Sequence, residues 1–208
     1  HRLHLLTGLV VIFCSPRSAA DQPNILFIIT DDQAYDAVHS LGGEELQTPH
    51  LDRLARRGVT FTHAYNMGAW HGAVCVASRT MLNTGQYIWH ARDAERDLKT
   101  KYTENKMLWS QLMAAQGYET FFTGKWHIKA DTAKIFDHVA HVRGGMPKQT
   151  KQGYNRPIEG QKDPWSPYDP KFGGFWEGGK HWSEVVGDDT ITFLKQAAKN
   201  DKPFFIYS

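Results

Sequence analysis

Cys75 and Arg79 have residue types and a spacing that suggest reactive chemistry. They stand four positions apart, in a stretch that ends in Thr84-Gly85. A terminal Thr-Gly is typical of the end of a short helix, so both side chains are expected on one helical face, with the thiol near the N-terminus. The helix dipole and unpaired N–H groups there stabilise anions, and the guanidinium adds a fixed cation. The pattern predicts a site for an anionic tetrahedral group, and a buried structural cysteine is the alternative.

Asp31 and Asp32 form a second candidate site directly after the apolar, β-branched run 25–30. Such a run is typical of a central parallel strand covered on both faces, and open α/β sheets bind ligands where their strands end. Two adjacent carboxylates repel each other unless a cation lies between them, and oxygen ligands favour Ca²⁺ or Mg²⁺ over zinc. The pair therefore predicts a hard divalent cation, and two solvated acids in a turn are the alternative.

Lys125 and His127 follow a third apolar run, the expected strand 118–122. Alternation along an extended segment would place both side chains on one face. A lysine and a histidine side by side can hold an anion and transfer a proton. Without further context, a solvated lysine and a structural histidine explain the pair as well.

These three segments together resemble the type I, formylglycine-dependent sulfatases. The family signature is Cys-x-Pro/Ala-Ser-Arg followed by Leu-x-Thr-Gly, and the paired aspartates and the Gly-Lys-Trp-His segment are similar to family motifs too. The resemblance covers nearly all of the chain after residue 20. The matching signature positions are Cys75, Ala77, Ser78, Arg79, Leu82, Thr84 and Gly85.

The resemblance implies a sulfuric ester hydrolase with a specific division of roles. A formylglycine-generating enzyme oxidises Cys75, and the hydrated aldehyde attacks the sulfur of a sulfate ester. Asp31, Asp32 and residue 75 bind Ca²⁺, with Mg²⁺ as the alternative. Arg79 and Lys125 stabilise negative charge, and His127 orients or deprotonates the hydrate.

The expected substrate is a sulfated sugar or polysaccharide, by analogy with exported bacterial relatives. In the family, further ligands come from the chain beyond Ser208, so the 208 residues alone are expected to bind metal poorly and to have little activity.

Strands and helices alternate along the chain, which predicts an α/β fold with a mostly parallel sheet and helices on both faces. The resemblance narrows this to an incomplete alkaline-phosphatase-like fold. Further strands are expected at 59–65 and 203–208, and helices at 48–58, 104–116 and 188–199. The side chains expected to face the core from these helices are Leu51, Leu54, Ala55, Met107, Leu108, Leu112, Ala115, Ile191, Leu194 and Ala198.

Composition and the N-terminal residues bear on the location of the protein. A net charge of +2 and 41% hydrophobic residues suit a globular domain and do not indicate nucleic-acid binding. Residues 1–20 resemble a signal peptide whose start is missing, because an apolar run over 5–13 precedes Ser18-Ala19-Ala20. We therefore expect an exported, periplasmic or secreted protein without a membrane anchor, in which residues 21–208 form the N-terminal part of the catalytic domain.

Three alternative functions remain open from the sequence. One is a phosphonate or phosphate monoester hydrolase of the same fold, and another is an inactive fragment. The third is a non-catalytic protein that binds sulfated polysaccharides through segment 142–187, which is rich in glycine, lysine and aromatic residues. That segment could equally be an insertion that packs its own aromatic side chains. His138 and His141, expected on one helical face, are interpreted as structural.

Overall fold

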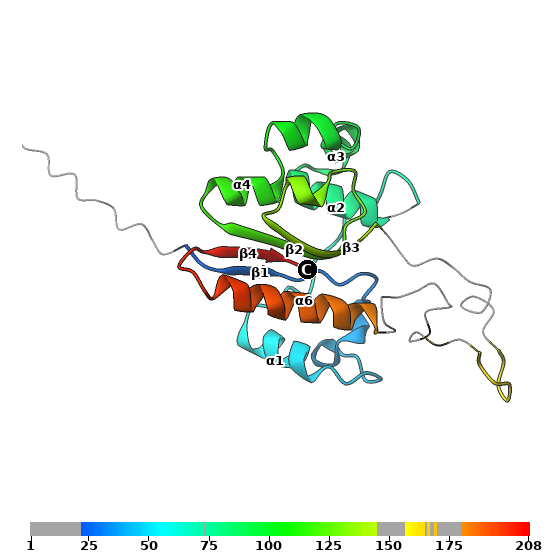
Figure 1. Ribbon diagram of the computed structural model, residues 1–208. Coiled ribbons are helices and arrows are strands. Elements are labelled where there is room, and N and C mark those ends of the chain that lie inside the picture. Colours follow the sequence, from blue (N-terminus) through cyan, green and yellow to red (C-terminus); the bar gives the residue numbers. More distant parts are fainter. Residues whose placement is uncertain (1–21, 73, 145–156, 165, 167–168, 170–179) are drawn as a thin grey trace, which may run out of the picture.

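The fold is built on one sheet of four parallel strands, ordered β1-β4-β2-β3 (Figure 1). The computed structural model describes residues 22–72, 74–144, 157–164, 166, 169 and 180–208. The strands are β1 (Ile25–Phe27), β2 (Glu119–Lys125), β3 (His138–Arg143) and β4 (Phe204–Tyr207). The helices are α1 (Pro49–Arg57), α2 (Val74–Thr84), α3 (Ile88–Ala94), α4 (Trp109–Ala115) and α6 (Trp182–Ala197), with short turns η1 (Tyr35–Ala37), η2 (His39–Leu41), η3 (Leu98–Tyr102) and η4 (Thr132–Lys134).

Helices cover both faces of this sheet. Helices α2, α3 and α4 lie on one side, whereas α6 lies against β2, β3 and β4 on the other (Figure 1). The arrangement confirms the expected α/β fold with a parallel sheet, as in the alkaline-phosphatase-like architecture. Among the described residues, no helix combines the length and hydropathy needed to cross a membrane.

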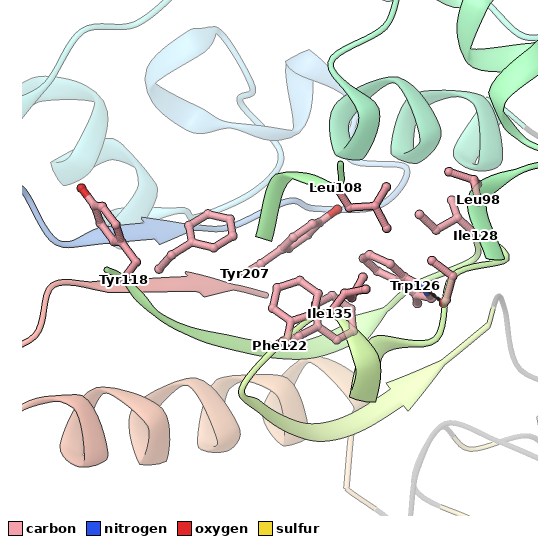
Figure 2. Packing of buried hydrophobic residues seen from close by; sticks show 11 residues of the cluster. Leu98, Leu108, Tyr118, Phe122, Trp126, Ile128, Ile135 and Tyr207 are labelled. Carbon is pink, nitrogen blue, oxygen red and sulfur yellow. Dashed lines mark hydrogen bonds between the residues drawn. The ribbon is translucent and has the colours of Figure 1, made fainter. Parts of the chain in front are cut away.

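The core consists of two layers because successive residues of a strand point to opposite faces. Phe122 and Tyr207 pair in register and pack with Trp126 on the α2 and α4 side (Figure 2). Phe121 and Ile206, one residue earlier on each strand, pack against α6 instead. Burying each of these large side chains stabilises the fold by roughly 1.5–3 kcal/mol, so β2 and β4 anchor the residues that follow them.

The region around α1 differs from the sequence predictions. The helix begins at Pro49 and ends before Gly58 as expected, but Leu51 is 39% and Leu54 68% exposed, so the expected buried stripe is wrong. The buried side chain of α1 is Asp52, which accepts hydrogen bonds from the Ser40 amide at 3.0 Å and the Thr48 hydroxyl at 2.9 Å. Residues 59–65 form no strand, because they are exposed and have no neighbouring strand among the described residues.

Helices α4 and α6 begin at other residues than expected and bury partly different side chains. Helix α4 begins at Trp109, after Leu108, and Leu112 is 53% exposed. Met107 and Ala115 are also exposed, because Trp109 and Met113 make the contact with the core. Helix α6 begins six residues before Asp188 and is capped by His181. Its buried side chains are Val185, Thr190, Phe193 and Ala197, so Ile191 and Ala198 face outward instead.

The sequence predictions for the segments that form β1 and β3 were also wrong in part. In the described part of the sheet, β1 lies at an edge with β4 as its neighbour, and Ile28 just after it is 61% exposed, so it is not covered on both faces. His138 and His141 belong to β3 rather than to a helix, and they contact different carboxylates, Glu119 and Asp189. Most of the aromatic segment 142–187 and all of the expected signal peptide lie outside the described residues.

Candidate active site

The ends of strands β1 and β2 and the start of helix α2 bring three reactive side chains together. Asp31 follows β1, Lys125 ends β2, and Cys75 is the second residue of α2. Nζ of Lys125 lies 3.3 Å from Sγ of Cys75 and also donates a hydrogen bond to Asp31. The Lys125 side chain is only 9% exposed, so its charge is held close to both partners.

Asp31, Asp32 and Cys75 form a candidate cation site. One potential ligand atom from each of the three residues lies within 4.8 Å of the other two. Carboxylate oxygens suit a hard divalent cation, and an oxygen in place of the Cys75 sulfur would make the donor set uniform. The three residues therefore fit Ca²⁺ or Mg²⁺ as part of a site, although Ca²⁺ takes about six to eight oxygens in total.

Arg79 is buried inside the site, with 3% of its surface exposed. Its guanidinium donates a hydrogen bond of 2.5 Å to the backbone carbonyl of Lys125, 46 residues away in sequence. The Arg79 carbonyl in turn accepts a hydrogen bond of 2.9 Å from the Asn83 side chain. Because a buried cation is costly without a partner, the hydrogen bond to the Lys125 carbonyl fixes helix α2 against the end of strand β2.

The register between strands β2 and β3 shifts just before Lys125. The register between β2 and β3 shifts between Phe122 and Gly124, and Gly124 has φ of 111°. That conformation is accessible to glycine and strained for other residues. Bulges at the ends of strands redirect the side chains that follow them. The extra residue lies in β3, between Val139 and Val142, and beyond it Lys125 pairs with Arg143 and contacts Asp31 and Cys75.

Two site residues have strained backbones. Asp32 has φ of 56° and His127 has φ of 63°, and the third non-glycine residue with positive φ in the described part of the chain is Lys106. Left-handed conformations cost free energy in residues with a Cβ and often occur at functional sites. At His127 this conformation also interrupts the extended backbone, so simple alternation does not explain how it comes to lie near Lys125.

His127 is held in its neutral form by its surroundings. Burial lowers the pKa of its imidazole below the ordinary value of 6.5, and the charges of Lys125 and Arg79 lower it further. Its Nδ1 atom is buried and has no hydrogen-bond partner among the described residues. A neutral imidazole with an open nitrogen can accept a proton or a hydrogen bond from a bound group.

Asp31 is held in its ionised form. Partial burial raises the pKa of this carboxyl group, but the hydrogen bond and charge of Lys125, together with Arg79, outweigh that effect and hold the pKa below its ordinary value of 3.8. An ionised Asp31 is the form that binds a cation. The site therefore combines a carboxylate with two nearby cations, Lys125 and Arg79.

The loop before Cys75 is organised by a residue that the sequence analysis did not single out. Glu95 accepts a hydrogen bond of 2.8 Å from the Trp70 indole, lies 3.9 Å from His71, and pairs with Lys129 at 3.3 Å. Glu95 lies 25 residues after Trp70, and no local pattern connects the two.

A cavity of about 750 Å³ adjoins Asp31, Arg79 and Lys125. Part of its wall comes from residues beyond the predicted site. Arg143 at the end of β3 and Trp182 at the start of α6 both line it, and the Arg143 guanidinium lies 4.6 Å from the centre of the Trp182 ring. The volume is in the range of small-molecule binding sites.

The chain was compared with known proteins. Residues 23–208 match the family model named Sulfatase. The chain is 32% identical over 189 residues to an N-acetylglucosamine-6-O-sulfatase of Bacteroides thetaiotaomicron, and the match covers 88% of this chain and 29% of that protein. It is 30% identical to an ulvan-active sulfatase of Formosa agariphila, covering 88% and 34%, and 30% identical to bovine arylsulfatase A, covering 73% and 30%. The chain thus spans about a third of the length of these curated relatives.

Proposed function

Because the chain belongs to the sulfatase family, we propose that it contributes the nucleophile and part of the cation site to an enzyme that hydrolyses sulfate esters. The observation that carries the proposal is the grouping of Cys75 with Lys125 and Asp31, with Sγ of Cys75 3.3 Å from Nζ of Lys125. Two similar proteins are named for N-acetylglucosamine-6-O-sulfate and for ulvan. The proposed substrate is therefore a sulfated carbohydrate.

Each charged residue of the site has a proposed role. Lys125 contacts the nucleophile and neutralises negative charge that develops on it and on the sulfuryl oxygens. Arg79, fixed to the Lys125 carbonyl, adds a second cation that does not need to reorganise during the reaction. His127, neutral and with Nδ1 open among the described contacts, orients the nucleophile or accepts its proton.

Two components are supplied from outside the chain in this proposal. Oxidation of Cys75 to formylglycine by a formylglycine-generating enzyme supplies an oxygen nucleophile. A hard divalent cation, Ca²⁺ or else Mg²⁺, supplies Lewis acidity toward the sulfate oxygens when bound by Asp31, Asp32 and residue 75.

Such a cation takes more ligands than these three residues offer. We therefore expect the 208 residues alone to bind Ca²⁺ weakly and to turn over little substrate. Export of the protein, to the periplasm or beyond the cell, stays a prediction.

The test is release of sulfate by the complete protein that carries this sequence, produced together with a formylglycine-generating enzyme. An aryl sulfate and the matching aryl phosphate are assayed in parallel, with Ca²⁺ or with a chelator. We expect the sulfate to be cleaved in preference to the phosphate, and the Cys75→Ala variant to lose activity by a factor of 10³ or more.

Two controls make this result interpretable. Arg92, an exposed residue of α3, gives a matched surface variant, Arg92→Gln, which is expected to retain activity. Unchanged thermal unfolding of Cys75→Ala shows that the loss is chemical rather than structural. Faster cleavage of the phosphate would assign the site to the phosphate monoester hydrolases, and activity that survives in Cys75→Ala would refute the nucleophile.

A further inference from the structure

One cationic side chain that lines the cavity, Arg143, has no role in the proposed reaction. We propose that Arg143 binds a second anionic group of the substrate, a sulfate or a carboxylate, on the alcohol side of the cleaved bond. This rests on the proposed function and deepens it, because it makes the preferred substrate a polyanionic carbohydrate. Arg143 would then determine specificity.

Sheet register places Arg143 next to the reaction centre. Arg143 is the register partner of Lys125 on the neighbouring strand, and adjacent strands lie about 4.8 Å apart. Lys125 and Arg143 both line the cavity. A substrate whose scissile sulfate lies at Lys125 therefore has the rest of its structure within reach of Arg143.

Trp182 fixes the direction of the Arg143 guanidinium. A distance of 4.6 Å from the ring centre is within the range of cation–π interactions. This contact brings the Arg143 guanidinium and Trp182 together at the wall of the cavity that both line. A guanidinium has five N–H donors in a planar fork that matches a carboxylate or a sulfate, so Arg143 can bind a ligand while keeping its other partners.

The charges and the surface of the cavity suit a polyanionic carbohydrate. Among the described residues that line it, three are cationic, Arg79, Lys125 and Arg143, and one is a carboxylate, Asp31. Such an excess of positive charge raises the local concentration of anions. The remaining wall includes apolar side chains that can pack against the carbon skeleton of a sugar, namely Ile28, Leu51, Val186 and Ile191.

The experiment compares two substrates that differ in a single charge. One is a sulfated disaccharide with a free uronic acid carboxylate on the sugar next to the sulfate ester, and the other is its methyl ester. A disulfated disaccharide and its monosulfated parent form a second pair. The ratio of kcat/KM within each pair is measured for the complete, formylglycine-containing protein and for the variants Arg143→Gln, Arg143→Lys and Arg92→Gln.

We expect the unmodified protein to favour the extra anion about tenfold, or about 1.4 kcal/mol, mainly through KM, because Arg143 pairs with this charge both before and during cleavage. Arg143→Gln should bring the ratio close to one, Arg143→Lys should keep part of it, and Arg92→Gln should leave it unchanged. Trp182→Phe should weaken the preference less than Arg143→Gln, because it alters only how the guanidinium is held.

An unmodified protein without preference, or a preference that survives in both Arg143 variants, would overturn the inference. Thermal unfolding identifies any variant that fails to fold. If Arg143→Gln fails to fold, the substrate preference of Arg143→Lys is compared with that of the unmodified protein instead. If no sulfate ester is cleaved at all, the proposed function fails, and calorimetry with Cys75→Ala still decides the inference. In that case tighter binding of the carboxylate over its methyl ester, lost on adding Arg143→Gln, supports it, and equal binding overturns it.

Discussion

Helices α1 and α2 both bury polar side chains, but α1 buries only Asp52, whereas α2 buries four residues. In α2, polar side chains are inside: Arg79 is 3%, Thr80 0% and Asn83 1% exposed. In α1, apolar side chains are outside, with Leu54 68% exposed. Helix α1 makes its main contacts with η2, whereas α2 packs against α3 and α4. The buried face of α2 therefore consists mainly of polar side chains around the candidate site, with Ala77 as its apolar member.

The polar interior of α2 has a physical cost. The Thr80 hydroxyl and the Asn83 side-chain oxygen have no hydrogen-bond partner among the described residues, and each such group costs about 1–3 kcal/mol. The neighbouring Tyr207 is also affected, since burial raises the pKa of its hydroxyl despite the nearby charge of Arg79. Selection for stability alone would favour apolar side chains at these positions, so their polarity supports the role proposed for Arg79.

The largest difference between the two helices is expected at their arginines. Arg79→Ala removes a buried cation and its hydrogen bond to the Lys125 carbonyl, so sulfate release should fall by a factor of 10²–10³. Stability should fall by about 2–4 kcal/mol, because a cavity and an unpaired carbonyl remain. The matched variant Arg57→Ala, in the exposed last turn of α1, should change activity less than twofold. Kinetics and urea unfolding measure both effects, and equal losses in the two variants would refute the comparison.

A smaller difference is expected from apolar substitutions in the same helices. Ala77 of α2 is completely buried, so Ala77→Leu should destabilise the protein by about 1–3 kcal/mol through overpacking. Leu54→Ala in α1 removes an exposed side chain and should change stability by less than about 0.5 kcal/mol. Urea unfolding of the two variants makes the measurement. A large loss in Leu54→Ala would mean that this face of α1 is covered in the complete protein.

The smallest expected effect is a pH dependence that originates near α2. Burial and then the charges of Lys125 and Arg79 lower the pKa of His127 below 6.5. Below about pH 6.5 the unfolded chain therefore binds a proton that the folded chain does not, and stability should fall as the pH falls. His127→Gln should flatten this part of the profile, while His50→Gln, at an exposed residue of α1, should not. Urea midpoints from pH 7.5 to 5 would show it, and identical profiles in all three proteins would contradict the shift.

The candidate site was more predictable than the fold around it. Asp31, Cys75, Arg79, Lys125 and His127 carry local patterns, and parallel strands bring their ends to one edge of a sheet. His127 lies near Lys125 through a left-handed backbone rather than the expected alternation, but the grouping of Asp31, Cys75 and Lys125 could be expected from the order of elements. Glu95 and Arg143 could not, because the contacts of Glu95 with Trp70 and of Arg143 with Trp182 join residues distant in sequence.

The predictions about the fold were wrong where the spacing of apolar residues was used to assign burial. Leu51 and Leu54 have helical spacing, yet α1 meets η2 through Asp52, which is hydrogen-bonded to Ser40. Hydrophobic periodicity shows which face a helix could bury but not whether a partner lies against it. The predicted start of α6 at Asp188 was wrong because the helix begins at Trp182 with His181 as its cap. Histidine is not among the usual capping residues.

The most direct test of the proposed nucleophile is the mass of the tryptic peptide from Gly58 to Arg79, which contains Cys75. The protein is produced with a formylglycine-generating enzyme, and a known substrate of that enzyme serves as the conversion control. We expect a peptide in which an aldehyde replaces the thiol of Cys75. An unmodified thiol alongside a converted control would contradict the proposed nucleophile and favour the binding or inactive alternatives.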